Sequence, residues 1–177
     1  MHASRYFFSL WPNPVVARQL QQIQARLPAG RLTHGADLHL TLAFLGEVSE
    51  ADEVKLHHLL QAIPFSAFEL VLDRLDAFRR IGLSWAGPSQ IPLALQTLYD
   101  TFGAALDDQG IWWDKRLVFR PHVTLARKAV VPQQHLTAPV VWWADRIVLA
   151  RSGAAAPVGQ RYTILAQRYA KGDVRPV

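Results

Sequence analysis

The sequence contains no cysteine, a single methionine and no long hydrophobic run. The absence of cysteine excludes a disulfide scaffold, thiolate zinc sites and a cysteine nucleophile. The short apolar run at residues 6–11 is ended by Pro12 and Pro14, so it is too short for a secretory leader or a membrane span. We therefore expect a soluble, cytoplasmic protein that does not contact a membrane.

Several sequence motifs of enzymes are also missing. The chain has no Gly-x-x-x-x-Gly-Lys loop, no Gly-x-Ser-x-Gly elbow and no His-Glu-x-x-His pair. Mechanisms driven by ATP, acyl transfer to serine and a helix-borne zinc site are therefore disfavoured. Acidic residues are few, with 14 against 19 lysines and arginines, which gives a net charge of +5. This excess favours a polyanionic partner without identifying one.

The 177 residues, half of them hydrophobic, are enough for one compact domain or for two small lobes that share a cleft. Asn13 before Pro14, and Ser49 before Asp52, are typical of helix starts. Apolar spacing predicts helices over residues 14–27, 50–63 and 92–109. Strands are predicted over residues 5–11, 38–46, 68–78, 81–86, 117–127, 140–151 and 160–169, with a seam between lobes at residues 87–89. These elements indicate an α+β fold of mostly antiparallel strands.

One short pattern occurs twice, once in each half of the chain. Residues 39–43 and 122–126 both read His, aliphatic, Thr, Leu, Ala. Repeated sequence at a long period indicates repeated structure. Side chains alternate along a strand, so we expect His39, Thr41 and Ala43 to share one face, and the second copy to repeat this with its own histidine, threonine and alanine. Two such strands facing one another would form a two-histidine site.

Two histidines and two threonines suit displacement at phosphorus. An imidazole has an ordinary pKa near 6.5, so one neutral ring can remove a proton while one protonated ring supplies another. The attacking and leaving oxygens lie roughly in line at phosphorus, which matches two rings on opposite sides. The threonine hydroxyls can donate hydrogen bonds to the remaining phosphate oxygens. Zinc would need a third ligand from His34, His135 or a distant carboxylate, and no motif supports that set.

The two motifs and their flanks resemble a known family. Residues 37–48 and 119–127 are similar to the two motifs of the two-histidine phosphoesterase superfamily, and most of all to its RNA 2',3'-cyclic phosphodiesterase branch, also called 2'-5' RNA ligase. Residues 5–10 and 161–163 resemble that family's opening and closing strands. The resemblance implies a single domain over residues 1–177, built from two lobes related by a pseudo-twofold axis. Each lobe is expected to be a small antiparallel sheet backed by helices, with one motif per lobe at the shared cleft.

The resemblance also implies an activity. It predicts hydrolysis of a 2',3'-cyclic phosphate at an RNA end to a 2'-phosphate, without metal or cofactor. The reverse reaction would join such an end to a 5'-hydroxyl through a 2'-5' linkage, as seen in that family with tRNA halves. By matching position, His39 is the proton donor to the leaving 3'-oxygen, His122 is the base that activates water, and Thr41 and Thr124 hold the phosphate. The acid and base labels come from the family, because the two motifs are nearly identical.

Other roles and other functions stay open at this point. Arg127 matches a family arginine near the phosphate, although strict alternation points it away from His122. Phe7 and Phe8 are candidates for stacking on the terminal base. A relative that opens a different small cyclic phosphate, such as a cyclic nucleotide or a cyclic ADP-ribose phosphate, would use identical chemistry. A non-enzymatic nucleotide- or RNA-binding module is the third alternative, but it would not need a matched acid and base.

Overall fold

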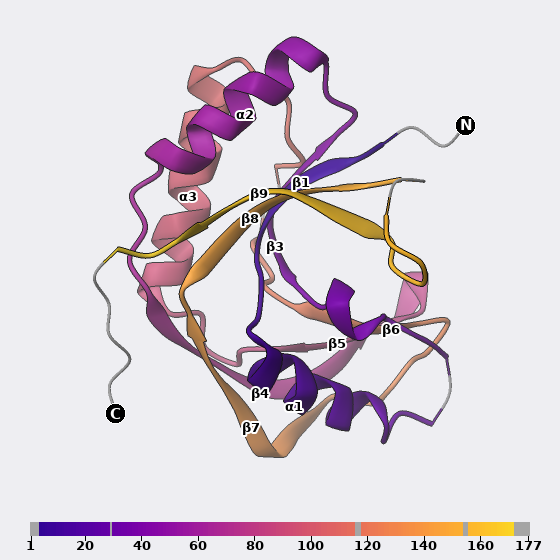
Figure 1. Cartoon of the computed structure of the whole chain (residues 1–177). Coiled ribbons are helices and arrows are strands. Elements are labelled where there is room, and N and C mark those ends of the chain that lie inside the picture. Colours follow the sequence, from indigo (N-terminus) through magenta and orange to yellow (C-terminus); the bar gives the residue numbers. More distant parts are fainter. Residues whose placement is uncertain (1–3, 29, 116–117, 154–155, 172–177) are drawn as a thin grey trace.

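The computed structural model describes residues 4–28, 30–115, 118–153 and 156–171 (Figure 1). Within these residues there are three α-helices and nine strands, and two short 3-10 turns, η1 (Gly35–Asp37) and η2 (Arg79–Ile81). The helices are α1 (Pro14–Gln24), α2 (Glu50–Ala62) and α3 (Leu93–Asp108). The strands are β1 (Tyr6–Leu10), β2 (Arg31–Leu32), β3 (Leu40–Gly46), β4 (Phe68–Phe78), β5 (Leu83–Gly87), β6 (Val123–Arg127), β7 (Gln134–Ala144), β8 (Arg146–Ser152) and β9 (Tyr162–Tyr169).

All of these strands belong to one antiparallel sheet. Its order is β7-β4-β5-β6-β3-β1-β8-β9, and β2 pairs with β6 off this path. The expected α+β class with antiparallel strands is confirmed, and the two small sheets are halves of one sheet. Those halves meet at β3 and β6, where the one registered pair is Leu40 opposite Val123. A twofold relation between the halves stays a prediction.

The helices begin where the sequence predicts. The Asn13 side chain accepts hydrogen bonds from two backbone N–H groups of the first turn of α1, and the Ser49 hydroxyl accepts one from the N–H of Asp52. These bonds satisfy N–H groups that have no partner within a helix. In Figure 1, α2 and α3 lie in the upper left of the view and α1 lies at the bottom, near β7.

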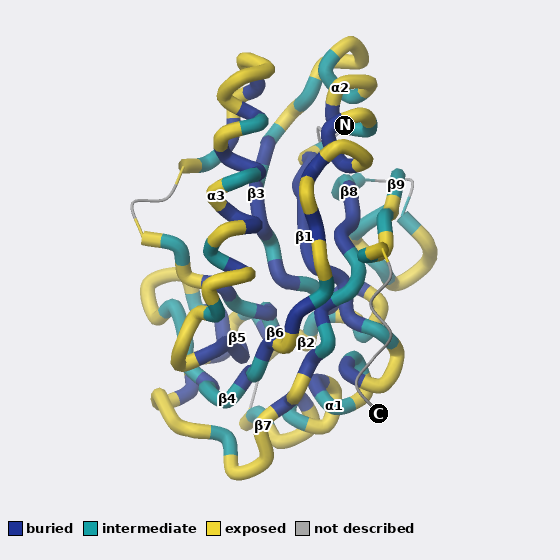
Figure 2. The backbone as a smooth tube through the Cα atoms, turned by 90° about the vertical axis from the view of Figure 1, so that its left-hand side faces the viewer, coloured by how far each residue is buried: buried dark blue, intermediate teal, exposed yellow. Residues whose placement is uncertain are grey.

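The core is continuous across the halves of the sheet. Large buried side chains from β1, β3, α2, α3 and β7 form a single cluster. Figure 2 shows β1, β3 and β8 largely buried, while the helices are exposed on their outer sides. No helix in the part of the chain that the structure describes is long and apolar enough to cross a membrane.

Three expectations about the strands are wrong. The run expected at residues 140–151 is two strands, β7 and β8, which break at Asp145. β5 and β6, which flank residues 87–89 along the sequence of strands, are neighbours in the same half of the sheet, so no seam between halves falls at these residues. Both motif strands begin one residue after their histidine, at Leu40 and Val123. Leu117, where the second motif strand was expected to start, lies outside the described residues.

A bulge in each motif strand changes which side chains share a face. Between β3 and β1 the register skips Leu42, and between β6 and β5 it skips Leu125. One extra residue reverses the alternation beyond it. Ala43 and Ala126 are therefore buried, instead of facing the site as strict alternation predicts.

A buried amide supports the bulge in β6. The side-chain nitrogen of Gln24, at the end of α1, donates to the carbonyls of Thr33 and Leu125 at 2.8 Å each. The carbonyl of Leu125 also accepts from the N–H of Thr33. Since Gln24 is 4 % exposed, these bonds form away from water and are costly to remove.

We expect Gln24→Met to lower the free energy of unfolding by about 1–3 kcal/mol, because it leaves the carbonyl of Thr33 without this buried donor. Gln22→Met is the matched control, since Gln22 is exposed on the same helix. Urea unfolding followed by circular dichroism measures both. Equal stabilities for the two variants would contradict this account of the bulge.

Candidate active site

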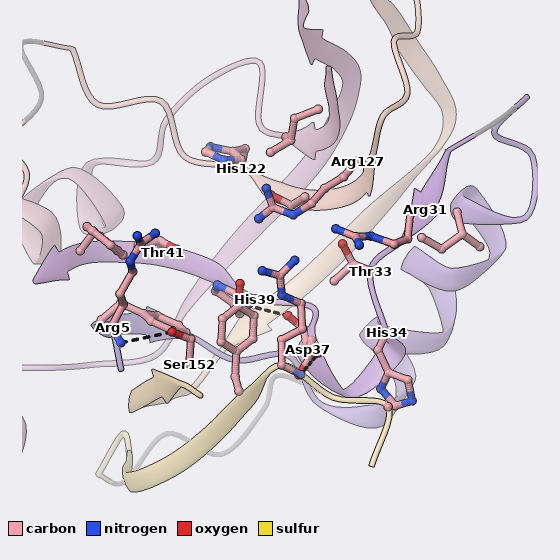
Figure 3. A pocket seen from close by; sticks show the side chains of 18 residues that line it. Arg5, Arg31, Thr33, His34, Asp37, His39, Thr41, His122, Arg127 and Ser152 are labelled. Atoms are coloured by element: carbon pink, nitrogen blue, oxygen red, sulfur yellow. Dashed lines mark hydrogen bonds between the residues drawn. The ribbon is translucent and has the colours of Figure 1, made fainter. Parts of the chain in front are cut away.

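The pairing of β3 with β6 brings the two motifs together. Leu40 and Val123, the registered pair, are both buried in the core. Continuing the antiparallel register by one residue in each direction puts His39 opposite Thr124, and Thr41 opposite His122. Neighbouring residues of a strand point to opposite faces, so these four side chains share the face that the core does not occupy. All four line one pocket (Figure 3).

Each histidine ring is oriented by a backbone carbonyl two residues before it. Nδ1 of His39 lies 2.6 Å from the carbonyl oxygen of Asp37, and Nδ1 of His122 lies 2.7 Å from that of Arg120. A carbonyl oxygen can only accept, so Nδ1 is the donor in both rings. Each ring could therefore exchange a proton with a ligand through Nε2.

Aromatic side chains pack around both histidines. Phe7 and Trp11 stack on His39 with ring centroids 4.8 and 5.1 Å away, and Tyr162 meets it edge-on at 5.1 Å. Phe78 packs against His122 in an edge-on arrangement, with centroids 4.9 Å apart. These contacts limit the rotation of the imidazole rings.

The two candidates for base stacking, Phe7 and Phe8, lie in different environments. Phe7 lines the pocket, but it is 4 % exposed and stacks on His39. Phe8 is fully buried and packs against Phe102 of α3. The expectation that Phe8 contacts a base is wrong, because neighbouring residues of β1 point to opposite faces of the sheet.

The bulges bring Phe44 and Arg127 into the pocket. Both residues lie three positions after the motif threonine, and both line the pocket. Strict alternation would point Arg127 away from His122, but the extra residue at Leu125 returns its side chain to the site face. Figure 3 shows the guanidinium of Arg127 directed into the space between the two histidines.

The pocket has a volume of about 980 Å³ and a cationic lining. Four arginines line it, namely Arg5, Arg31, Arg127 and Arg161. The carboxylate in the lining, that of Asp37, is 1 % exposed and accepts a hydrogen bond from the N–H of Arg161 at 2.8 Å. Burial raises the pKa of this carboxyl group. The lining therefore suits an anion.

Sequence reasoning missed several of these residues. Phe44 could have been found by aligning the two repeats, since it occupies the position that Arg127 has in the second copy. Arg5 and Arg161 begin the two segments that resemble the family's opening and closing strands, but no site role was assigned to them, and Arg31 lies in a segment without such a resemblance. Among the described residues, no group of three or more His, Cys, Asp or Glu side chains is arranged to hold a metal ion.

His39 is neutral in the ligand-free pocket. The pKa of His39 is lowered to about 4: burial lowers it most, the hydrogen bond to the carbonyl of Asp37 raises it, and the nearby positive charges of His122 and Arg127 lower it. The unfolded chain takes up this proton near pH 6.5, whereas the folded chain does so near pH 4. The contribution of His39 to stability therefore falls as the pH falls through this window.

Comparison with known proteins agrees with this geometry. Residues 10–85 match the family model described as LigT like phosphoesterase. The chain is 39 % identical over 101 residues to the RNA 2',3'-cyclic phosphodiesterase of Escherichia coli (strain K12), a match that covers 57 % of each protein. The protein of the same name from Aeropyrum pernix is 35 % identical over 94 residues, which cover 51 % of this chain and 53 % of the relative. These matches thus span little more than half of the curated relatives.

Solved structures extend the similarity to nearly the whole chain. The crystal structure of E. coli LigT complexed with 3'-AMP superposes with a TM-score of 0.83 at 30 % identity, and the match covers 96 % of this chain and 99 % of that one. The chain belongs to the LigT-like phosphoesterase family. LigT in its apo form superposes with a TM-score of 0.78 over the same shares. Membership of the two-histidine superfamily, expected from the motifs, is confirmed.

We expect an NMR titration to give His39 a pKa of about 4 in the free protein. Arg127→Gln should raise this pKa, because it removes a nearby positive charge. Arg18→Gln, on the exposed side of α1, is the control and should leave it unchanged. An ordinary pKa near 6.5 in the wild-type protein would contradict the environment described for this ring.

Proposed function

We propose that this chain is an RNA 2',3'-cyclic phosphodiesterase that uses His39 and His122 as acid and base. The observation that supports the proposal is the pairing of Leu40 with Val123 at the junction of β3 and β6, since continuing this register sets each motif histidine opposite the other motif's threonine. Two imidazoles with Nδ1 engaged by backbone carbonyls offer Nε2 for proton transfer, one for each side of a phosphate. The names of the curated relatives support this reaction.

The proposed hydrolysis is one in-line displacement. Nε2 of His122 takes a proton from water as the water oxygen bonds to phosphorus, and the bond from phosphorus to the 3'-oxygen breaks. His39 gives its proton to that leaving oxygen. The products are a 2'-phosphate and a 3'-hydroxyl, and the two histidines have exchanged protonation states. A proton must then return to His39 from solvent before the next cycle.

The other residues of the site stabilise the charge on the phosphate. The hydroxyls of Thr41 and Thr124 donate to the oxygens that do not react, as negative charge builds on them. The guanidinium of Arg127 supplies a positive charge at the same place and can donate two parallel hydrogen bonds. Phe7 and Trp11 hold the ring of His39 in position, which is a role in orientation.

A general acid must carry a proton, yet the low pKa of His39 leaves its ring neutral at neutral pH. Substrate binding can supply the missing condition by raising this pKa. In the empty pocket the ring is neutral, because burial and the positive charge of Arg127, together with that of His122 whenever His122 is protonated, disfavour its protonated form. A bound phosphodiester brings one negative charge between the histidines, which favours the protonated ring. We propose that His39 acquires its catalytic proton together with the substrate. The protonated form of His39 would then be populated only in the complex with substrate.

The cationic pocket favours an RNA end as substrate. Arg5, Arg31 and Arg161 extend the positive lining beyond the four motif side chains, and further phosphates of a strand would find partners there. LigT has been crystallised with 3'-AMP, a mononucleotide. We also propose the joining reaction, in which a 5'-hydroxyl in place of water attacks the cyclic phosphate to form a 2'-5' linkage, with tRNA halves as candidate substrates.

The test is an assay of the purified protein in EDTA with a short RNA that ends in a 2',3'-cyclic phosphate. We expect wild type to release a 2'-phosphate, and His39→Ala and His122→Ala each to lose activity by roughly 100-fold to 10,000-fold. His58→Ala, an exposed histidine of α2, is the matched control and should keep full activity. Product identity is read by chromatography against both phosphate isomers.

Three results would count against the proposal. No turnover by wild type would reject an RNA end as substrate and leave small cyclic nucleotides or cyclic ADP-ribose phosphate to be tested. A 3'-phosphate product would mean that the other ester bond breaks. Activity that survives both substitutions would place the chemistry outside this site.

A further inference from the structure

A second groove opens beside the active site. It has a volume of about 930 Å³ and shares Thr41, Phe44, Leu83 and His122 with the first pocket. Its other walls are the turn η2, the segment around Phe119 and Arg120, and Tyr99 of α3. The two cavities therefore adjoin one another at Thr41 and His122.

The two histidines are placed differently with respect to this groove. The structure describes both motif histidines. His122 lines both the first pocket and the second groove, whereas His39 lines only the first pocket. In the proposed reaction His122 deprotonates the attacking oxygen, whereas His39 serves the leaving oxygen of the ribose. In-line displacement puts these two oxygens on opposite sides of phosphorus. The second groove thus opens on the side from which the attacking group arrives.

The lining of the second groove has the chemistry of a single-stranded RNA site. Arg79, Arg80 and Arg120 are exposed along it, and the carboxylate in its lining is that of Asp114. Phe119 is half-buried and stacks on Tyr99, with ring centroids 3.9 Å apart. Cationic side chains beside an aromatic ring are what single-stranded nucleic acids bind, through phosphates and stacked bases.

We propose that the second groove binds the RNA strand whose 5'-hydroxyl attacks the cyclic phosphate. This inference rests on the proposed function. In the joining step, His122 takes the proton of the 5'-hydroxyl, the 5'-oxygen bonds to phosphorus, the bond to the 3'-oxygen breaks, and His39 protonates that oxygen. One phosphodiester replaces another, so the step needs no ATP. Water occupies the same side during hydrolysis and needs none of the groove.

The proposal separates two activities that share one catalytic site. The doubly substituted variant Arg79→Ser with Arg80→Ser removes two exposed charges from the groove. We expect it to raise the KM for a 5'-hydroxyl RNA by about tenfold, while hydrolysis of the cyclic phosphate stays within about twofold of wild type. Arg18→Ser with Arg26→Ser makes the same change in net charge at two exposed positions, one on α1 and one just after it, and should alter neither activity.

Salt dependence gives a readout that is independent of the absolute rate. For a single strand, each phosphate contact contributes about 0.7 to the slope of log affinity against log salt. Loss of two contacts should therefore reduce the slope for the 5'-hydroxyl strand by about 1.4 in the groove variant. The slope for the strand that carries the cyclic phosphate should not change.

The experiment uses the full chain, a cyclic-phosphate RNA and a separate 5'-hydroxyl RNA, and it also follows the reverse cleavage of 2'-5'-linked RNA. The proposal is overturned if the groove variant behaves like the control pair, or if hydrolysis and joining fall together. It is also overturned if wild type hydrolyses the cyclic phosphate but neither joins nor cleaves 2'-5'-linked RNA. Failure of wild type to hydrolyse the cyclic phosphate would instead reject the proposed function.

Discussion

The active site depends on a single antiparallel contact, between Leu40 of β3 and Val123 of β6. Both side chains are fully buried, so burial of apolar surface on one face of the sheet fixes what lies on the other. A slip of one residue would send the histidines into the core and the leucine and valine into the pocket. The core therefore enforces the geometry of the site.

The surrounding protein also fixes the orientation of the two histidine rings. Each Nδ1 is held by a carbonyl of its own loop, and the ring faces or edges are held by aromatic side chains of the neighbouring strands. His39 is half-buried beside Arg127 and His122, and it is neutral when the pocket is empty. A pocket that disfavours protonation of His39 until an anion arrives favours an anionic ligand, since binding of the anion and protonation of the ring support one another.

Much of this could be predicted from the sequence, because its signals are local. The caps at Asn13 and Ser49, the three amphipathic helices and the repeated His-x-Thr pattern all depend on residues within a few positions of one another. The bulges at Leu42 and Leu125 could not be predicted, since a register shift is a relation between two strands. That relation decides whether Ala43 or Phe44, and Ala126 or Arg127, faces the pocket. The arginines from distant segments were hidden for the same reason.

The most direct test of a two-histidine displacement is a crystal structure of the protein with uridine and vanadate, which together mimic the five-coordinate transition state at phosphorus. The account predicts vanadium at the junction of β3 and β6, with its two apical oxygens about 2.6–3.2 Å from Nε2 of His39 and Nε2 of His122. The equatorial oxygens would face Thr41 and Thr124. Vanadate held by one histidine alone, or with both histidines on the same side of it, would contradict the account.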